Sequence, residues 1–356
     1  MEKDDLFNAV FQEGKPGPAL KGYHVGAVIR SLAISFDGKL LACTDGKGQL
    51  HVFNTSTGKR TIHLEPKPGE FESWFWGVVF CTEKNLFACY RNRKQNEIGE
   101  VIEIRDAETG KCVRTLKDAS KYAVLDRGGK FLVASDPMNP ANLKIWDWIK
   151  DEPLHTIKLN PKYHELGLGE GCWVAFTSDG KTFATGENYG PLQIWDMQTG
   201  KLVRKVMGNN AKTFSLVFSP DGQTLAAGNT KGFIRLWDAA KGTLKARYQV
   251  DARRAGEATI SVIQQICFSP DGKTLFSCGL EETICRFDLT TGKKLPDIKT
   301  GESLSCLVFS PDGTRLFSAG HGGTIRQWDM KTGAEIYLND SPKSSQEKGR
   351  ESLLDK

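Results

Sequence analysis

The sequence lacks the features that would mark a membrane protein, a disulfide-bonded protein or a metal protein. No apolar run approaches the roughly 18 residues that a membrane helix needs. The nine cysteines are scattered singly, with no C-x-x-C pair and no histidine cluster beside them. We therefore expect small buried thiols in a reducing compartment, and neither disulfides nor a zinc site.

The sequence also lacks strong net charge, and its first residues do not have the pattern of a secretory signal. The net charge of +5 is mild for 356 residues, so it favours neither a dedicated nucleic-acid binder nor a membrane-surface protein. The first residues, "MEKDDLFNAVFQEGKPG", are acidic where a secretory signal would have a basic region followed by an apolar one. The sequence therefore predicts a cytoplasmic protein, and 39% apolar residues suit one with a sizeable core.

Catalytic motifs are sparse as well. The chain has no G-x-x-x-x-G-K-[ST] phosphate loop and no H-E-x-x-H zinc motif. "GESLS" at 301–305 fails the G-x-S-x-G pattern at its last position, and "GLGEG" at 167–171 has no helix after it to meet a pyrophosphate. The six histidines are scattered along the chain without metal-ligand spacing. We expect a protein that is not an enzyme and that holds no cofactor or metal.

What the sequence does contain is a repeat. Each copy has an apolar run, an Asp-Gly or similar turn, a second apolar run, a turn with Gly and a third run. Runs such as Leu216-Val217-Phe218 are apolar on both faces, which indicates sheets covered on both sides. No segment shows a sustained helical period. Five clear and two weaker copies occur, at residues 31–59, 78–111, 123–147, 173–201, 215–242, 265–293 and 306–333.

The recurring "FSPDG…L…G…I…WD…TG" resembles the repeat of the WD40 family over residues 28–338. The resemblance implies an all-β fold, a seven-bladed β-propeller of four-stranded antiparallel blades. We divide the chain into an N-terminal extension (1–18), the propeller (19–338) and a polar tail (339–356) that we expect to be disordered. The outer strand of the last blade could be "PALKGYHV" near the N-terminus or "GAEIYL" at 333–338, and the sequence supports both.

The chain departs from the family in its polar residues. The Gly-His pair expected before each first strand is missing, and the Asp expected after the second strand is replaced in four repeats by Lys47, Lys231, Glu281 and Gly322. The family's buried His–Ser–Asp–Trp network is therefore not expected in those blades. Their stability should come from apolar packing between blades and from the Asp-Gly turns.

Insertions mark one face of the expected propeller. WD40-like propellers bind partners on the face made by loops that enter the innermost strands and by loops that join the second and third strands. The "PDG" and "TG" turns of the opposite face are short here, so variation falls on the first face, where binding tends to lie. The inserted segments are 65–76, 90–100, 136–142, 160–173 and 250–262.

Seven residues should ring the mouth of the channel, each eight positions before the Gly of an Asp-Gly turn or its equivalent. They are Arg30, Trp76, Lys121, Cys172, Phe214, Gln264 and Ser305. In this family such residues often contact the partner, and a mixture of aromatic and basic side chains is typical of a binding hot spot. The predicted contact residues are Arg30, Trp76, Lys121, Phe214 and Gln264, with Trp74, Phe75, Arg91, Arg93, Arg253 and Arg254 from the loops.

The loop aromatics have a second interpretation. One or two of Phe71, Trp74, Phe75 and Trp76 could pack down as a small core for the long loop, because Trp is usually largely buried. The basic loop residues could equally form a solvated rim. The sharper hypothesis is that at least one aromatic stays open beside the bases and anchors an acidic or phosphorylated segment.

The sequence thus predicts a non-catalytic interaction scaffold that binds a protein or peptide partner, acidic or phosphorylated, on the loop-rich face. It predicts a monomer or a member of a multiprotein complex, and no membrane partner. RNA binding through the same basic and aromatic face is the first alternative. A small-ligand binder or an enzyme that uses the central channel is the second, because fold does not fix function.

Overall fold

The computed structural model of the chain covers the region of the repeats. It describes residues 23–66, 75–81, 85–92, 100–116, 124–125, 131–136, 139–150, 152–159, 173–186, 190–208, 211–250, 253–254, 257–258 and 262–336. All regular elements in these ranges are β-strands, as expected. A helix long and apolar enough to cross a membrane is therefore not found in them.

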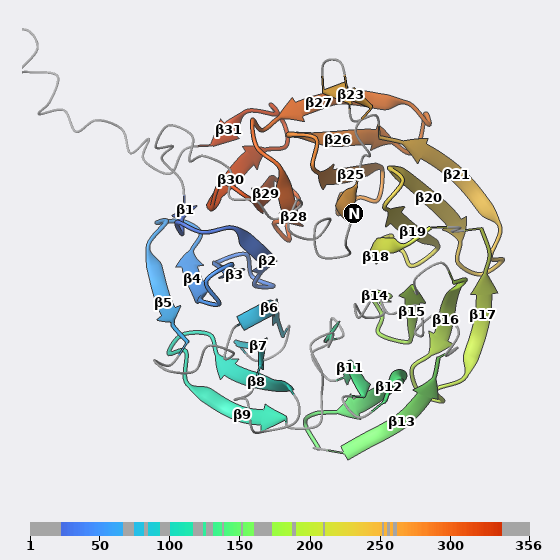
Figure 1. Cartoon of the computed structure of the whole chain (residues 1–356), viewed down its shortest axis with the longest axis horizontal. Helices are drawn as coiled ribbons and strands as arrows, with labels where there is room; N and C mark the ends of the chain where they lie inside the picture. Colours follow the sequence, from blue (N-terminus) through green and yellow to red (C-terminus); the bar gives the residue numbers. More distant parts are fainter. Residues whose placement is uncertain are drawn as a thin grey trace, which may run out of the picture.

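Apart from the two-residue strands at 253–254 and 257–258, the strands form seven antiparallel sheets arranged as a ring, with the strand that begins each repeat nearest the centre (Figure 1). Blade 1 consists of β2 (Ile29–Ile34), β3 (Leu40–Asp45), β4 (Leu50–Asn54) and β5 (Arg60–Leu64), and blade 2 of β6 (Phe75–Phe80), β7 (Leu86–Asn92), β8 (Glu100–Asp106) and β9 (Cys112–Leu116). Blade 3 consists of β10 (Val124–Leu125), β11 (Phe131–Asp136), β12 (Asn139–Asp147) and β13 (Glu152–Lys158), and blade 4 of β14 (Trp173–Phe176), β15 (Thr182–Gly186), β16 (Leu192–Asp196) and β17 (Leu202–Val206). Blade 5 consists of β18 (Thr213–Phe218), β19 (Thr224–Asn229), β20 (Phe233–Asp238) and β21 (Leu244–Gln249), and blade 6 of β24 (Ile263–Phe268), β25 (Thr274–Gly279), β26 (Thr283–Asp288) and β27 (Lys294–Lys299). Blade 7 consists of β28 (Leu304–Phe309), β29 (Arg315–Gly320), β30 (Thr324–Asp329) and two short outer strands. The predicted seven-bladed β-propeller is confirmed.

Both termini contribute to the outer edge of blade 7. The short strand β1 (Tyr23–His24) pairs with the start of β30, and β31 (Glu335–Ile336) pairs with its end. The two alternatives left open by the sequence are therefore both realised, each over two residues. The N-terminal strand closes the ring onto blade 1, since the Tyr23 hydroxyl donates a hydrogen bond to the carbonyl of Thr55 at 3.1 Å.

The Asp-Gly turns explain why "FSPDG" recurs. In blade 5 the Ser219 hydroxyl and the Gln223 N–H both donate to Oδ1 of Asp221, at 2.5 and 3.0 Å, and Gly222 takes a φ of +71°. These hydrogen bonds favour the ionised carboxylate and lower the pKa of Asp221. The same turn is built by Ser35 and Asp37, Thr177 and Asp179, Ser269 and Asp271, and Ser310 and Asp312.

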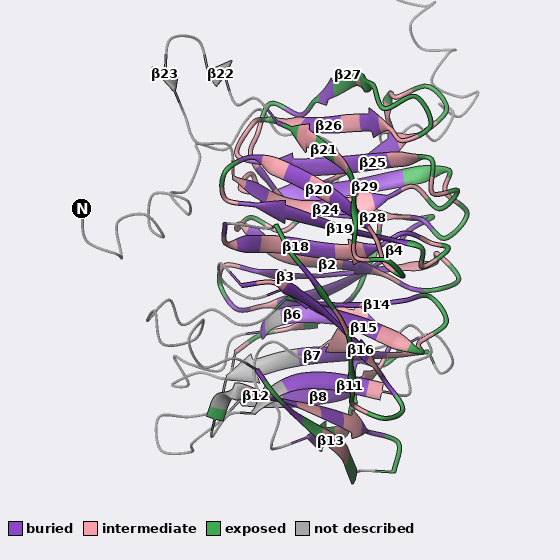
Figure 2. Cartoon of the chain, turned by 90° about the vertical axis from the view of Figure 1, so that its right-hand side faces the viewer, coloured by how far each residue is buried: buried purple, intermediate pink, exposed green. Residues whose placement is uncertain are grey.

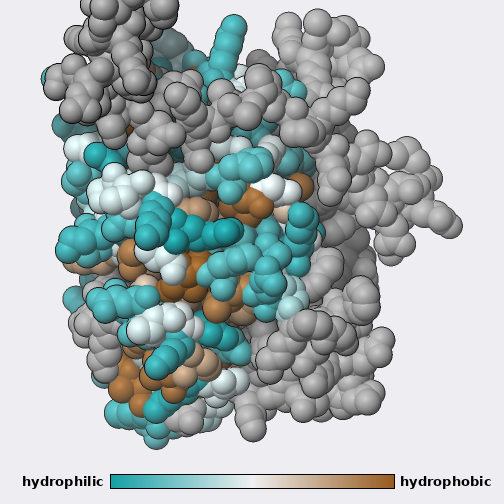
Figure 3. All heavy atoms as spheres, turned by 90° about the vertical axis from the view of Figure 1, so that its left-hand side faces the viewer, coloured by the Kyte–Doolittle hydropathy of each residue, from teal (hydrophilic) through white to brown (hydrophobic). Residues whose placement is uncertain are grey.

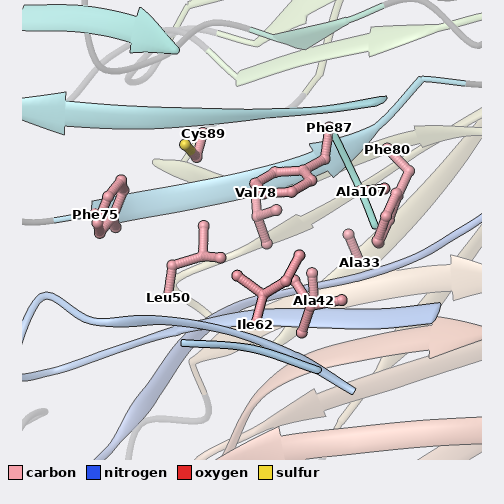
Figure 4. Packing of buried hydrophobic residues seen from close by; sticks show 11 residues of the cluster. Ala33, Ala42, Leu50, Ile62, Phe75, Val78, Phe80, Phe87, Cys89 and Ala107 are labelled. Carbon is pink, nitrogen blue, oxygen red and sulfur yellow. The ribbon is translucent and has the colours of Figure 1, made fainter. Parts of the chain in front are cut away.

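Apolar side chains fill the spaces between neighbouring blades. Leu50 and Ile62 of blade 1 point toward Val78 and Phe87 of blade 2 (Figure 4). Buried residues accordingly run along the inner three strands, while exposed residues gather at turns and outer strands (Figure 2). On the side of the ring that carries β5, hydrophilic side chains surround smaller hydrophobic patches (Figure 3). The two-sided apolar pattern of the sequence is thus explained by blade-on-blade packing.

Part of the family's polar network survives in a reduced form. In blade 7 the Trp328 indole N–H donates to the Ser318 hydroxyl at 2.8 Å, although Gly322 stands where the family has Asp. In blade 4 Trp195 donates to Thr185 at 3.0 Å. The expectation that no full network forms in blade 7 is therefore refined, because its Trp–Ser pair is satisfied without the missing Asp.

Candidate functional site at the loop face

One face of the ring is formed by the beginnings of the first strands and by the turns between second and third strands. We call it the loop face, and its described parts include residues 28–30, 46–48, 212–214, 230–232, 303–305 and 320–322. Backbone hydrogen bonds join the two sets, as from Gly46 N to Val28 O at 2.7 Å and from His321 N to Ser303 O at 3.1 Å. The pairing of the two loop sets on one face follows from the antiparallel order of each blade.

The predicted ring residues occupy one structural position, a β-bulge in the first strand. The register between the first and second strands shifts on either side of each of them. A bulge leaves one residue of the strand outside the ladder of paired residues. The five residues placed in this way are Arg30, Trp76, Phe214, Gln264 and Ser305. Lys121 and Cys172 lie outside the described residues.

In blades 1, 5, 6 and 7 the residue after the bulge ties the blade to the next one. Ser31 and Ser215 hydroxyls accept hydrogen bonds from the N–H groups of Val78 and Ile266, at 3.2 and 3.0 Å. The thiol of Cys306 donates to the carbonyl of Arg30 at 3.3 Å, which links blade 7 to blade 1. In blade 6 the equivalent residue is Gln265, whose Oε1 accepts from Leu307 N at 2.6 Å. A small or polar side chain at this position therefore acts as a tie between first strands.

Blade 4 breaks this pattern. Trp173 pairs with Gly186 as Ser215 pairs with Gly228, so it occupies the position of the tie, yet its side chain is 42% exposed. Its ring centroid lies 6.3 Å from that of Phe214, and the Lys212 ammonium lies 5.0 Å from the Phe214 ring. Two aromatic rings and a cation thus meet at the loop face between blades 4 and 5.

Comparison with known families agrees with the ring of blades. The model of the family described as "WD domain, G-beta repeat" matches residues 200–238, 257–288 and 295–329. Each match ends with the third strand of a blade, at the last residue of β20, β26 and β30. The chain is a WD40-repeat protein. WD40 propellers generally serve as scaffolds for protein interactions. No curated protein matches the chain.

One predicted contact residue of this WD40 propeller is wrong. Phe75 begins β6 and is only 3% exposed, packed between blades 1 and 2, and its N–H donates to the carbonyl of Gly48 at 3.1 Å. The physical reason is its place directly before the bulge, where the side chain still points into the blade interface. The equivalent residues of four other blades are buried too, namely Ile29, Thr213, Ile263 and Leu304.

For the other predicted contact residues of the loops, the structure describes either the backbone alone or nothing. The Arg91 backbone pairs with Phe75, and Arg253 and Arg254 form β22 (Arg253–Arg254), which pairs with β23 (Glu257–Ala258) outside the blades. Phe71, Trp74 and Arg93 lie outside the described residues, as do most residues of the five inserted segments. Their role in binding stays a prediction.

The sequence reasoning missed Trp173 because it selected the bulge position, which in this repeat is Cys172. A comparison one residue further along would have found it. There the other repeats carry Ser31, Gly77, Tyr122, Ser215, Gln265 and Cys306, so Trp173 and Tyr122 are the two aromatic residues at a position that is otherwise small or polar.

Arg30 at the channel mouth carries a guanidinium whose pKa is shifted by its surroundings. Burial lowers the pKa of this guanidinium, and the nearby Asp45 carboxylate opposes that shift. Arginine remains charged at neutral pH under such shifts. In the described part of the chain, no group of three or more His, Cys, Asp or Glu side chains could hold a metal ion.

Proposed function

We propose that this WD40 propeller is a non-catalytic scaffold that binds a protein or peptide on its loop face. The exposed Trp173 beside Phe214 and Lys212 is the observation that carries the proposal. Trp and basic residues at the centre of a face are the types that dominate binding energy in protein interfaces. The three side chains belong to, or directly precede, strands of the rigid ring, so little ordering is required when a partner docks.

The partner chemistry follows from the charges on the loop face. Lys212 at Phe214 and Arg30 at the bulge of blade 1 favour an acidic or phosphorylated segment with an aromatic or apolar residue that fits beside Trp173. RNA is the alternative, since the same rings could stack on splayed bases. A small ligand or substrate in the channel is the other alternative.

The proposal is tested with a double variant, Trp173→Ala with Phe214→Ala, in affinity purification followed by mass spectrometry. Phe36→Ala is the matched control, because Phe36 is 61% exposed but lies beside an Asp-Gly turn on the opposite face. We expect the double variant to lose partners that the wild type and the Phe36→Ala variant retain. Unchanged partners in a folded double variant would contradict the proposal.

Measuring retention of the protein on single-stranded RNA distinguishes a protein partner from an RNA partner. Binding that falls steeply with salt and requires Trp173 and Phe214 would favour RNA over a protein partner. A hydrolytic or ligand-binding activity that survives the double variant would favour the channel.

We also propose a cytoplasmic location. The eight described cysteines are free. Burial raises the pKa of Cys267 and Cys306 to about 12, so these thiols are unreactive apolar side chains suited to a reducing compartment. Fractionation of the cells that express the protein checks this location.

A further inference from the structure

The outer strands of blades 4 and 5 carry much of the exposed apolar surface. β17 and β21 follow each other along the outer edge of the ring (Figure 1). Eight large hydrophobic residues are exposed in the described part of the chain, and four of them belong to these strands or directly follow β17. They are Leu202, Val203, Met207 and Leu244, which are 39–69% exposed. We call residues 196–207 and 238–249, the two strands with the turns before them, the blade 4–5 rim.

A contact between the two blades brings the aliphatic side chains together. The Arg204 guanidinium on β17 donates a hydrogen bond to the carbonyl of Lys241 at 3.3 Å. Leu202 and Val203 directly precede this arginine, and Leu244 follows Lys241 by three residues. The exposed aliphatic residues of both strands therefore gather where the two blades meet.

Positive charge surrounds these aliphatic side chains. Residues 196–207 and 238–249 contain six Lys and Arg but only two Asp, and both Asp carboxylates accept N–H groups of their own turns. Lys201, Lys205 and Lys241 are exposed, and within the described residues none of them forms an ion pair with a carboxylate. The mild net charge of the whole chain, from which we expected no membrane partner, does not reveal this local surface.

Blades 2 and 3 repeat the arrangement with a different charge. Arg114 of β9 donates to the carbonyl of Ile149 at 3.2 Å, and Val113 and Ile149 are both exposed. Residues 106–116 and 147–158, however, contain four Lys and Arg against five Asp and Glu. Exposed aliphatic side chains thus occur at both places, and of the two only the blade 4–5 rim combines them with positive charge.

We propose that the blade 4–5 rim is a docking surface for an anionic lipid membrane. Lysine and arginine near such a membrane are attracted by its anionic headgroups. Aliphatic side chains beside them enter the boundary between headgroups and acyl chains, while lysine stems cover apolar surface and keep their ammonium groups in water. Stable attachment to a membrane takes two such signals, and the rim supplies both.

The chemistry of the rim favours a membrane over a soluble polyanion. Single-stranded nucleic acids bind where bases stack on aromatic rings, whereas the exposed apolar residues of the rim are Leu, Val and Met. Tyr248, the one aromatic residue of β17 and β21, is partly buried, and its ring centroid lies 4.7 Å from that of Phe287 in blade 6. Because the rim is built from outer strands, a membrane bound there leaves the loop face accessible to a partner.

Vesicle flotation with the full chain tests the proposal. The probes are phosphatidylcholine vesicles that contain about one third phosphatidylserine, and vesicles of phosphatidylcholine alone. We expect at least about tenfold more binding to the anionic vesicles, and this binding should fall as the salt concentration rises. The double variant Trp173→Ala with Phe214→Ala should bind the vesicles normally, which separates the rim from the proposed site on the loop face.

Blade 2 offers a matched control for each signal. Val203 and Val113 stand at the bulges of β17 and β9, and they are 53 and 61% exposed. Lys201 and Lys111 are exposed, and each follows the Gly of a "TG" turn. We expect Lys201→Gln to weaken binding to anionic vesicles about fivefold and Val203→Gln about threefold. Lys111→Gln and Val113→Gln should leave the binding unchanged.

Three results would overturn the proposal. The first is equal binding to neutral and anionic vesicles, or binding to neither. The second is an equal loss from the variants of blades 2 and 4, which would show a general effect of surface charge or apolarity. The third is a loss from Lys201→Gln with none from Val203→Gln, which would assign the rim to a soluble polyanion or an acidic protein surface.

Discussion

Blades 7 and 5 place an arginine at the same position of the repeat and surround it differently. Arg326 is 14% exposed and contacts Glu302 and Glu335, at 3.1 and 3.6 Å. Arg235 faces Arg247 across the strand pair. An arginine at this position can therefore stabilise its blade or face another cation, and the residues on adjoining strands and loops decide which.

The first prediction breaks the internal pairing of blade 7. Glu302→Ala removes the carboxylate that accepts hydrogen bonds from the Gly322 N–H and the Arg326 guanidinium, at 2.5 and 3.1 Å. We expect the free energy of unfolding to fall by about 2–4 kcal/mol, because a largely buried arginine loses its nearer carboxylate. Urea unfolding measures the loss.

A conservative variant separates charge from hydrogen bonding in the same place. Glu302→Gln can still accept a hydrogen bond from Gly322 but cannot neutralise Arg326, so it should lose less stability than Glu302→Ala. Burial already raises the pKa of Glu302, against the attraction of Arg326, which indicates that the charged form is held at a cost. A loss from Glu302→Ala below roughly 0.5 kcal/mol would contradict a structural role for the pair.

The second prediction concerns a substitution that gives the arginine of blade 5 an opposite charge, as in blade 7. Arg247→Glu replaces a like-charged cross-strand pair with an opposite one, and should raise the free energy of unfolding by about 0.5 kcal/mol at low salt. The gain should shrink at high salt, because Arg247 is exposed and its interactions are screened. Lys205→Glu, which faces the uncharged Gln193, is the control that should gain less. A less stable Arg247→Glu variant would show that the arginines do not repel.

The propeller itself could be predicted because it rests on repeated local signals. Alternating turns and apolar runs specify strands, and the Asp-Gly turns fix where each strand pair begins. The residues beside Arg326 and Arg235 could not be predicted, because they come from other strands and loops. Arg326 and Arg235 occupy the same position of the repeat. Glu302, from the loop before the first strand, forms an ion pair with Arg326, whereas Arg247 on the outer strand stands across from Arg235.

The candidate site was predicted in part for a similar reason. Counting back from the turn located the bulge residues, since the first strands of five blades are all six residues long, and Phe214 and Gln264 lie where expected. Counting could not tell which neighbour of a bulge points outward. Phe75 is buried directly before one bulge, and Trp173 is exposed directly after the equivalent position in blade 4. Three-dimensional packing decides these cases.

The last and smallest prediction uses blade 1, which places two histidines where blade 5 has two arginines. His51 stands across from His63, with ring centroids 4.8 Å apart. Burial, His51 and Arg60 lower the pKa of His63 below 6.5, against the opposing pull of Glu65 and Asp45. The unfolded chain therefore takes up the proton first, so stability is lost as pH falls through about 6.5 and levels off below the folded pKa. Because His63 is partly exposed, the loss should be only a few tenths of a kcal/mol. His63→Gln should flatten this part of a urea-unfolding profile against pH. An unchanged slope would show that His63 does not carry this part of the pH dependence. A flattened slope would show that the lowered pKa of His63 carries it, a response to pH that Arg235 and Arg247 do not have.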